Sequence, residues 1–206
     1  SSAVATATYT INLPLSTMDQ IFAAATAAGS TATDVNITFG SWVVSGVSTN
    51  GKNVFVTDGT KGFVVFDNGG SMGFAVGDVL SGTAACKVQL YKGAAELTLL
   101  TSTTEGLSVA TGGSVTPEVK AISALGGINT GAPVTINSVQ FDGEYLSDGA
   151  NSIKPYNSLF AYEALENGKY YNVTGIYQQF GNTTKEILPR SAADIEEVAI
   201  PTAVIA

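Results

Sequence analysis

Apolar and polar residues alternate along most of the first half of the chain, and the clearest run covers residues 74–100. Its alternating apolar positions are Val88, Leu90, Leu97 and Leu99. A period of two is typical of a strand with one buried face. We predict a long strand that follows a turn at Gly77-Asp78, bends at Gly82, and turns at Lys92-Gly93 into a second strand.

Three more strands are predicted upstream of this run. They cover residues 35–46, 53–57 and 63–67. A slip in the alternation at Gly40-Ser41 predicts a bulge, which allows a long strand to bend. Asn50-Gly51 is a strong hairpin signal, and residues 58–62 form a second tight turn. The pattern therefore predicts five strands joined mostly by short connections.

A helical period appears once, before the first of these strands. Apolar residues recur at helical spacing over residues 18–28, and Gly29 is a favourable stop. We predict Ser16 as the N-cap, with Asp19 in the place of the capping-box acid. Residues 9–13 are predicted as a short strand. The amphipathic stripe of the helix is expected to pack on the strands.

The strand order and three segments resemble the OB-fold. The segments are VFVTDGTKGFVVF at 54–66, VGDVLSG at 76–82 and LYKGAAELTLL at 90–100. The resemblance implies a five-stranded Greek-key barrel that binds oligonucleotides or oligosaccharides across its second and third strands. The usual helix between the third and fourth strands has no counterpart here, so we expect the N-terminal helix to plug the barrel instead.

A second unit of the same kind is predicted after Gly112-Gly113. The segments VLSG at 79–82 and VNI at 35–37 match NVTG at 172–175 and VTI at 134–136, and Glu96-Leu97 matches Glu186-Ile187. Residues 157–166 fit either a strand aligned with residues 63–66 or a helix that ends at Gly168, and we favour the strand.

The predicted fold is therefore all-β, with two tandem five-stranded OB-like barrels and one N-terminal helix. We expect an N-terminal strand and helix at residues 1–33, a first barrel at 34–112 and a second at 113–206. Such an arrangement is similar to tandem OB-like domains of secreted or surface bacterial proteins. Low lysine content with abundant Thr, Gly and Ala also favours a secreted or cell-surface location.

Charge and composition narrow the choice of partner. The net charge is −8, and the sequence contains no cluster of Lys or Arg residues. Binding to nucleic acid depends on neutralising phosphates with basic side chains, so this charge argues against a general nucleic-acid binder. A carbohydrate or a protein is the favoured ligand. No segment has the length and apolarity of a membrane span.

The chain contains no histidine, which removes Ser-His-Asp and Cys-His catalysis. The single cysteine, Cys86, lies in an apolar alternating run and is expected to be a small buried residue. Asp142, Glu144 and Asp148 lie at Asp-Gly turns, where acidic side chains commonly bond to the backbone of the turn. The alternatives are a calcium site formed by all three, or a glycosidase pair formed by Asp142 and Glu144. We predict no enzyme activity, no cofactor and no metal site.

Exposed rings on the second and third strands would form the ligand site of an OB-like barrel. The predicted ligand-binding residues are Trp42, Lys52, Phe55, Lys61, Phe63 and Tyr91. Most of the rings in this region are expected in the core, with Trp42 and Tyr91 the most exposed. We predict a non-catalytic binding or structural module. The alternative is a single-stranded nucleic-acid binder, which requires Lys52, Lys61 and Lys92 to cluster.

Overall fold

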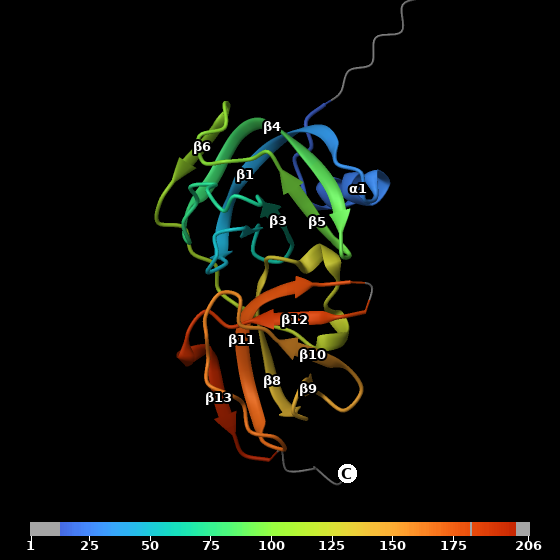
Figure 1. Ribbon diagram of the computed structural model, residues 1–206, viewed down its shortest axis with the longest axis vertical. Coiled ribbons are helices and arrows are strands. Elements are labelled where there is room, and N and C mark those ends of the chain that lie inside the picture. The colour runs from blue at the N-terminus through green and yellow to red at the C-terminus, as the bar shows by residue number, and fades with distance from the viewer. Residues whose placement is uncertain (1–12, 182, 201–206) are drawn as a thin grey trace, which may run out of the picture.

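A computed structural model describes residues 13–181 and 183–200, and its strands form two closed five-stranded barrels in tandem, stacked along the long axis of the molecule (Figure 1). The first barrel consists of β1 (Thr33–Val47), β2 (Asn53–Thr57), β3 (Gly62–Phe66), β4 (Val79–Tyr91) and β5 (Ala94–Thr98). The order β1-β2-β3-β5-β4 is closed by antiparallel pairing of β4 with β1, and β3 and β5 run parallel. This topology is consistent with an OB-like domain.

The second barrel repeats the plan. It consists of β8 (Pro133–Phe141), β9 (Leu146–Ser147), β10 (Ser152–Pro155), β11 (Tyr170–Gln179) and β12 (Lys185–Leu188). The order β8-β9-β10-β12-β11 is closed by β11 and β8, and β10 and β12 are again parallel. Each barrel also carries an added strand: β6 (Leu107–Ala110) pairs with β4, and β13 (Ile195–Val198) pairs with β11. The all-β prediction of two tandem barrels is confirmed.

The remaining elements are short. They are α1 (Met18–Ala28), β7 (Glu118–Val119) and three 3-10 turns, η1 (Ile122–Ala124), η2 (Gly127–Asn129) and η3 (Ala192–Asp194). Strand β7 pairs in parallel with β8, and Leu15 makes a single parallel bridge to β1, so a short parallel segment precedes both barrels. The strand predicted at residues 9–13 lies outside the described residues except for Leu13.

The helix α1 packs against the first barrel, beside β4 and β5 (Figure 1). Met18, Ile21 and Ala25 are buried in the hydrophobic core of that barrel, as predicted. The predicted cap is wrong by one residue: Thr17 is the N-cap, and its hydroxyl accepts from Gln20 N at 3.2 Å. The Gln20 side chain accepts from Thr17 N in return, which completes a capping box with an amide in place of the predicted acid.

The bulge predicted at Gly40-Ser41 is present. The register of β1 against β4 shifts between Gly40 and Trp42, and Ser41 has a φ of 61°. The second barrel has the same irregularity, because Ser138 has a φ of 53° and the register of β8 against β11 shifts beside it. Both first strands therefore bend at the same place, which allows them to close their barrels.

Hydrogen bonds define which residues of the two barrels are equivalent. The Thr38 and Thr83 hydroxyls lie 2.9 Å apart across β1 and β4, and the Thr135 and Thr174 hydroxyls lie 2.8 Å apart across β8 and β11. Residue 38 therefore corresponds to residue 135. The predicted match of 35–37 with 134–136, and that of 79–82 with 172–175, are both two residues out of register, whereas the match of Glu96 with Glu186 is correct because both sit at the parallel bridge.

The turn that follows the second strand is repeated almost atom for atom. Thr57 Oγ1 donates to Lys61 O and accepts from Gly59 N, at 2.7 and 2.9 Å. Ser147 Oγ makes the same two bonds to Asn151 O and Gly149 N, at 3.1 and 3.0 Å. The carboxylates of the intervening aspartates accept from the next backbone N–H groups in both turns. The duplication thus extends from topology to side chains.

Residues 157–166 are neither the predicted strand nor the alternative helix, because β10 already occupies the position of β3 and this segment is irregular. Leu159 packs between the two barrels, whereas Leu165 packs on the core of the second barrel. Apolar side chains of this one segment thus pack into two different hydrophobic clusters, and neither the spacing of a strand nor that of a helix predicts this arrangement.

The second barrel covers part of the outer face of β2 and β3. Phe55 and Val64, opposite one another on these strands, are buried against Ile176 and Leu188 of the second barrel, with Leu159 packed beside them. Polar contacts continue the interface: Ser45 Oγ donates to Gly131 O at 2.6 Å. At Gly62 the backbones approach so closely that a Cβ would lie 2.5 Å from Thr130 O.

The longest helix in the described part of the chain has eleven residues, and none there combines the length and apolarity needed to cross a membrane.

We expect Phe55→Ala to lower the free energy of unfolding by about 3 kcal/mol, because it removes a buried ring from the contact between the barrels. Urea unfolding followed by circular dichroism measures the loss, and the fluorescence of Trp42, in the core of the first barrel, reports that barrel alone. Phe180→Ala is the matched control, since that ring is 43% exposed. Equal losses in both variants would show that the contact contributes little.

Candidate functional site

A cleft of about 650 Å³ lies between the two barrels, beside the buried contact. The first barrel contributes the outer face of β3, β5 and β4, and the second contributes β11 and the residues after β10. Its lining comprises Ser48, Thr49, Asn50, Asn53, Val64, Phe66, Gln89, Tyr91, Lys92, Ala94, Glu96, Thr98, Thr130, Tyr156, Asn157, Ser158, Gln178, Gln179 and Phe180. Amides, hydroxyls and aromatic rings dominate this surface.

Three rings are exposed in the cleft. Tyr91, Tyr156 and Phe180 are 47%, 44% and 43% exposed, and Phe66 is half-buried. Tyr91 and Phe180 flank one ammonium group, since Lys92 Nζ lies 6.0 Å from the first ring centroid and 5.5 Å from the second. Gly181 N donates to Lys92 O at 2.6 Å, which joins the turns that carry these rings. Large exposed rings beside polar groups are typical of binding surfaces.

Glu96 is the one carboxylate among the described residues that line the cleft. It is 4% exposed, and its Oε1 accepts from Gln89 Nε2 at 2.5 Å on the neighbouring strand. Burial raises the pKa of this carboxyl, and the hydrogen bond from Gln89 partly opposes that rise. Gln89 and Glu96 therefore present one fixed pair of donor and acceptor groups to the cleft.

Gln179 holds the second barrel's side in place. Its side chain accepts from the buried Tyr177 hydroxyl at 2.7 Å and donates to Gly181 O at 2.7 Å. Its backbone N–H donates to Thr130 Oγ1 at 3.1 Å. This network fixes the turn beside Phe180, so the position of that ring is determined by buried polar contacts.

The Ser158 hydroxyl is an unsatisfied group at the other end of the cleft. Its Oγ is buried and has no hydrogen-bond partner among the residues that the structure describes. The Ser158 backbone oxygen accepts from Thr49 N at 2.8 Å, which ties this segment to the first barrel. A buried hydroxyl without a partner carries an energetic cost that a ligand or a water molecule can relieve.

The structure distributes the predicted site residues over three places. Tyr91 lies in the cleft, Phe55 is buried between the barrels and Phe63 is in the core of the first barrel. The prediction that Trp42 is exposed is wrong: it is 6% exposed and packs edge-on against Phe39 and Phe63. The extra residue at the bulge turns Trp42 to the inner face.

The lysines of the nucleic-acid alternative do not gather on one face. Lys52 precedes β2 and donates to Asn68 Oδ1 at 3.2 Å, whereas Lys61 follows β2 and pairs with Asp19 at 2.6 Å. These two side chains belong to opposite ends of the same strand, and Lys92 lies at the rim of the cleft. Among the described residues, these three lysines therefore form no basic track of the kind that follows a phosphate backbone.

The acidic turns of the second barrel do not converge on a cation. Asp142 Oδ1 accepts from Glu144 N and Tyr145 N, at 2.9 and 2.6 Å, and these bonds lower the pKa of Asp142. Glu144 pairs with Lys154 at 2.9 Å, and Asp148 caps its own turn. No group of three metal-ligating side chains occurs in the described part of the chain. The turn interpretation is confirmed for Asp142 and Asp148, whereas Glu144 forms an ion pair instead.

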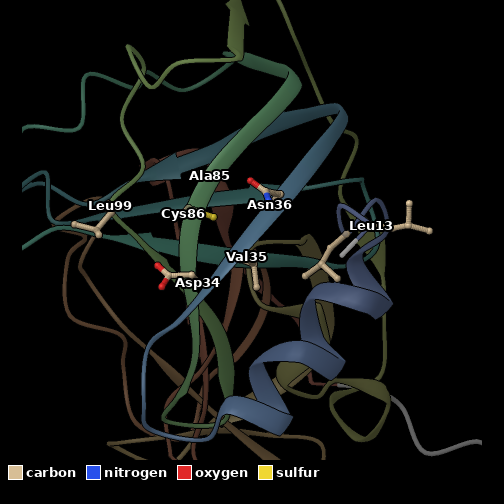
Figure 2. A pocket seen from close by; sticks show the side chains of 8 residues that line it. Leu13, Asp34, Val35, Asn36, Ala85, Cys86 and Leu99 are labelled. Carbon is tan, nitrogen blue, oxygen red and sulfur yellow. The ribbon is translucent and has the colours of Figure 1, made fainter. Parts of the chain in front are cut away.

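A second hollow of about 600 Å³ lies on the outside of the first barrel. Figure 2 shows Leu13 beside α1, Asp34, Val35 and Asn36 along β1, and Leu99 beyond β4. The one sulfur in it belongs to Cys86, which is buried as predicted, and burial raises the pKa of this thiol to about 12. The described lining of this hollow contains no aromatic ring, and Asn36 is its single amide side chain.

No protein-family model matches the chain, and no curated protein matches it.

Glu186 occupies in the second barrel the position that Glu96 occupies in the first, but it lies outside the cleft. It is 6% exposed, and burial raises its pKa from 4.5 to about 7, against the opposing charge of Lys154. A carboxyl with a raised pKa in the folded state binds its proton more tightly there than in the unfolded chain. Below pH 4.5 the Glu186 carboxyl therefore does not lower the free energy of unfolding. As the pH rises from 4.5 to about 7, it lowers the free energy of unfolding by an increasing amount.

We expect Glu186→Gln to raise the free energy of unfolding by about 2 to 3 kcal/mol near pH 8 and to change it little near pH 4, because the amide replaces a carboxylate that must otherwise be buried as an ion. Urea titrations at a series of pH values measure this difference. Glu105→Gln, at an exposed glutamate, is the control and should show no such dependence. A pH-independent effect at residue 186 would contradict the assignment.

Proposed function

We propose that this protein is a non-catalytic carbohydrate-binding module that acts in secreted form or at the cell surface, and that the cleft between the barrels holds a neutral sugar chain. The observation that supports this proposal is the lining of the cleft, which combines three exposed rings with uncharged amides and hydroxyls. Its volume is within the usual range for ligand pockets.

Sugar chemistry matches this lining. The faces of a pyranose ring carry C–H groups that pack on the electron-rich face of an aromatic ring, while its hydroxyls need donors and acceptors around the edge. Tyr91, Tyr156 and Phe180 offer the faces, and Gln89, Glu96 and Gln178 offer the edge groups. A neutral ligand is favoured because the chain carries a net charge of −8, which repels polyanions.

The absence of catalysis is part of the proposal. Hydrolysis of a glycoside requires two carboxyl groups that face each other across the scissile bond. Glu96 is the single acid among the described residues that line the cleft, and its Oε1 is engaged by Gln89. Its role is then to accept a hydrogen bond from a sugar hydroxyl.

We expect Tyr91→Ala to weaken binding to a neutral glycan about tenfold or more, since loss of a stacking ring costs about 1.4 kcal/mol or more. The measurement is a screen of immobilised cello-, xylo-, manno- and maltohexaose, followed by calorimetry with the glycan that is retained. Tyr145→Ala is the matched control, because that ring packs under Lys154 on the second barrel and not in the cleft. Failure to retain any of the glycans, or equal binding by both variants, would contradict the proposal.

A further inference from the structure

The two barrels line the cleft with equivalent positions. Gln89 pairs with Glu96 across β4 and β5, and Gln178 pairs with Glu186 across β11 and β12, so the two glutamines correspond. Strand β4 has two more residues between Thr83 and Gln89 than β11 has between Thr174 and Gln178. Tyr91 and Phe180 each follow two residues later. On the parallel strands, Val64 is opposite Glu96 and Lys154 is opposite Glu186.

It follows that Phe66 and Tyr156, two residues further on, also correspond. The cleft therefore contains three equivalent pairs: Gln89 with Gln178, Tyr91 with Phe180, and Phe66 with Tyr156. Each pair takes one member from each barrel.

The two ring pairs lie at opposite ends of the cleft. Tyr91 and Phe180 meet at Lys92, beside the β4–β5 turn. Phe66 is opposite Asn53 at the start of β2, and the chain after Tyr156 contacts the same region through the bond from Thr49 N to Ser158 O. The amides and Glu96 lie between the ends.

The strand geometry gives the separation of these ends. Tyr91 is opposite Ala94 on β5, and the register of β3 places Phe66 level with Thr98. Four residues along a strand span about 13 Å, which exceeds the reach of one sugar ring. A ligand that contacts both ring pairs must therefore be a chain of several units.

We infer that the cleft binds a linear homo-oligosaccharide with one stacking site at each end, one ring of each pair coming from each barrel. This inference rests on the proposed function and adds the length and the repeating nature of the ligand. A repeated sugar unit is favoured because both ends offer the same kinds of groups, with Tyr and Phe exchanged between the barrels. The site is composite: neither barrel holds a complete ring pair.

The test uses the whole chain and titrates cello-, xylo-, manno- and malto-oligosaccharides of one to six units by calorimetry. For the series that binds, we expect affinity to rise about tenfold or more between the monosaccharide and the hexaose. Phe180→Ala and Tyr156→Ala, at opposite ends, should each weaken hexaose binding about tenfold. Phe180→Tyr and Tyr156→Phe keep the rings and should retain it.

Short ligands separate the alternatives. If the inference holds, a monosaccharide or disaccharide contacts one end, so one of the two alanine variants leaves its binding unchanged. A monosaccharide that binds as tightly as the hexaose, and loses affinity in both variants, would overturn the two-ended site while leaving carbohydrate binding intact. Absence of binding at every length would overturn the proposed function itself.

Discussion

The packing of Phe55 and Val64 against Ile176 and Leu188 is the contact on which the arrangement of the molecule depends. It buries part of the outer face of β2 and β3, the face that an OB-like barrel commonly uses for its ligand. The second barrel therefore covers part of that face of the first barrel. What remains free is the adjoining surface of β3, β5 and β4, and this surface becomes one wall of the cleft. The same contact thus covers the face that OB-like barrels commonly use and brings together the walls of the cleft that we propose as the binding site.

The duplicated plan has diverged where the two barrels face different surroundings. The position of Val64 in the first barrel is taken by Lys154 in the second. Val64 is covered by the other barrel, whereas Lys154 is partly exposed and pairs with Glu144. The buried glutamate has stayed in both copies, as have the threonine pair between the closing strands and the hydroxyl-aspartate turn. Only the turn side chains among these bond to local backbone groups, whereas the residue at the covered face differs with its environment.

The strands, the bulge and the helix of the first barrel could be predicted because each has a local cause. Alternation sets the inner and outer faces of β2 and β3, and Asn50-Gly51 sets the hairpin. The two-residue error in aligning the copies has the same origin: a shift by two keeps every side chain on its face, so periodicity alone does not detect it. The irregular path of residues 157–166 depends on two clusters that form only after both barrels are in place.

The candidate site is the part of the structure that the sequence predicted least well. Tyr91 was predicted as an exposed ring near the second and third strands, and it lines the cleft. Tyr156 and Phe180 join the first barrel's Tyr91 and Phe66 there only because the two barrels dock. Each ring lies at or directly after the end of its strand, where a turn or loop begins, and this position is a weak signal when it is taken singly. The repetition of that placement in both barrels is a stronger signal for the site, but it is visible only when the two copies are aligned in the correct register. Trp42 shows the converse, since one added residue in a bulge reverses its side.

The hydroxyl-aspartate turns have a consequence for how the chain acquires its structure. Their bonds join residues within five positions of one another, so both hairpins need no distant partner to begin forming. The Phe55 cluster joins segments more than a hundred residues apart, and the entropy of closing such a loop delays it. Folding should then proceed from two separate starting points, and the shared cavity should be the last feature of the molecule to appear.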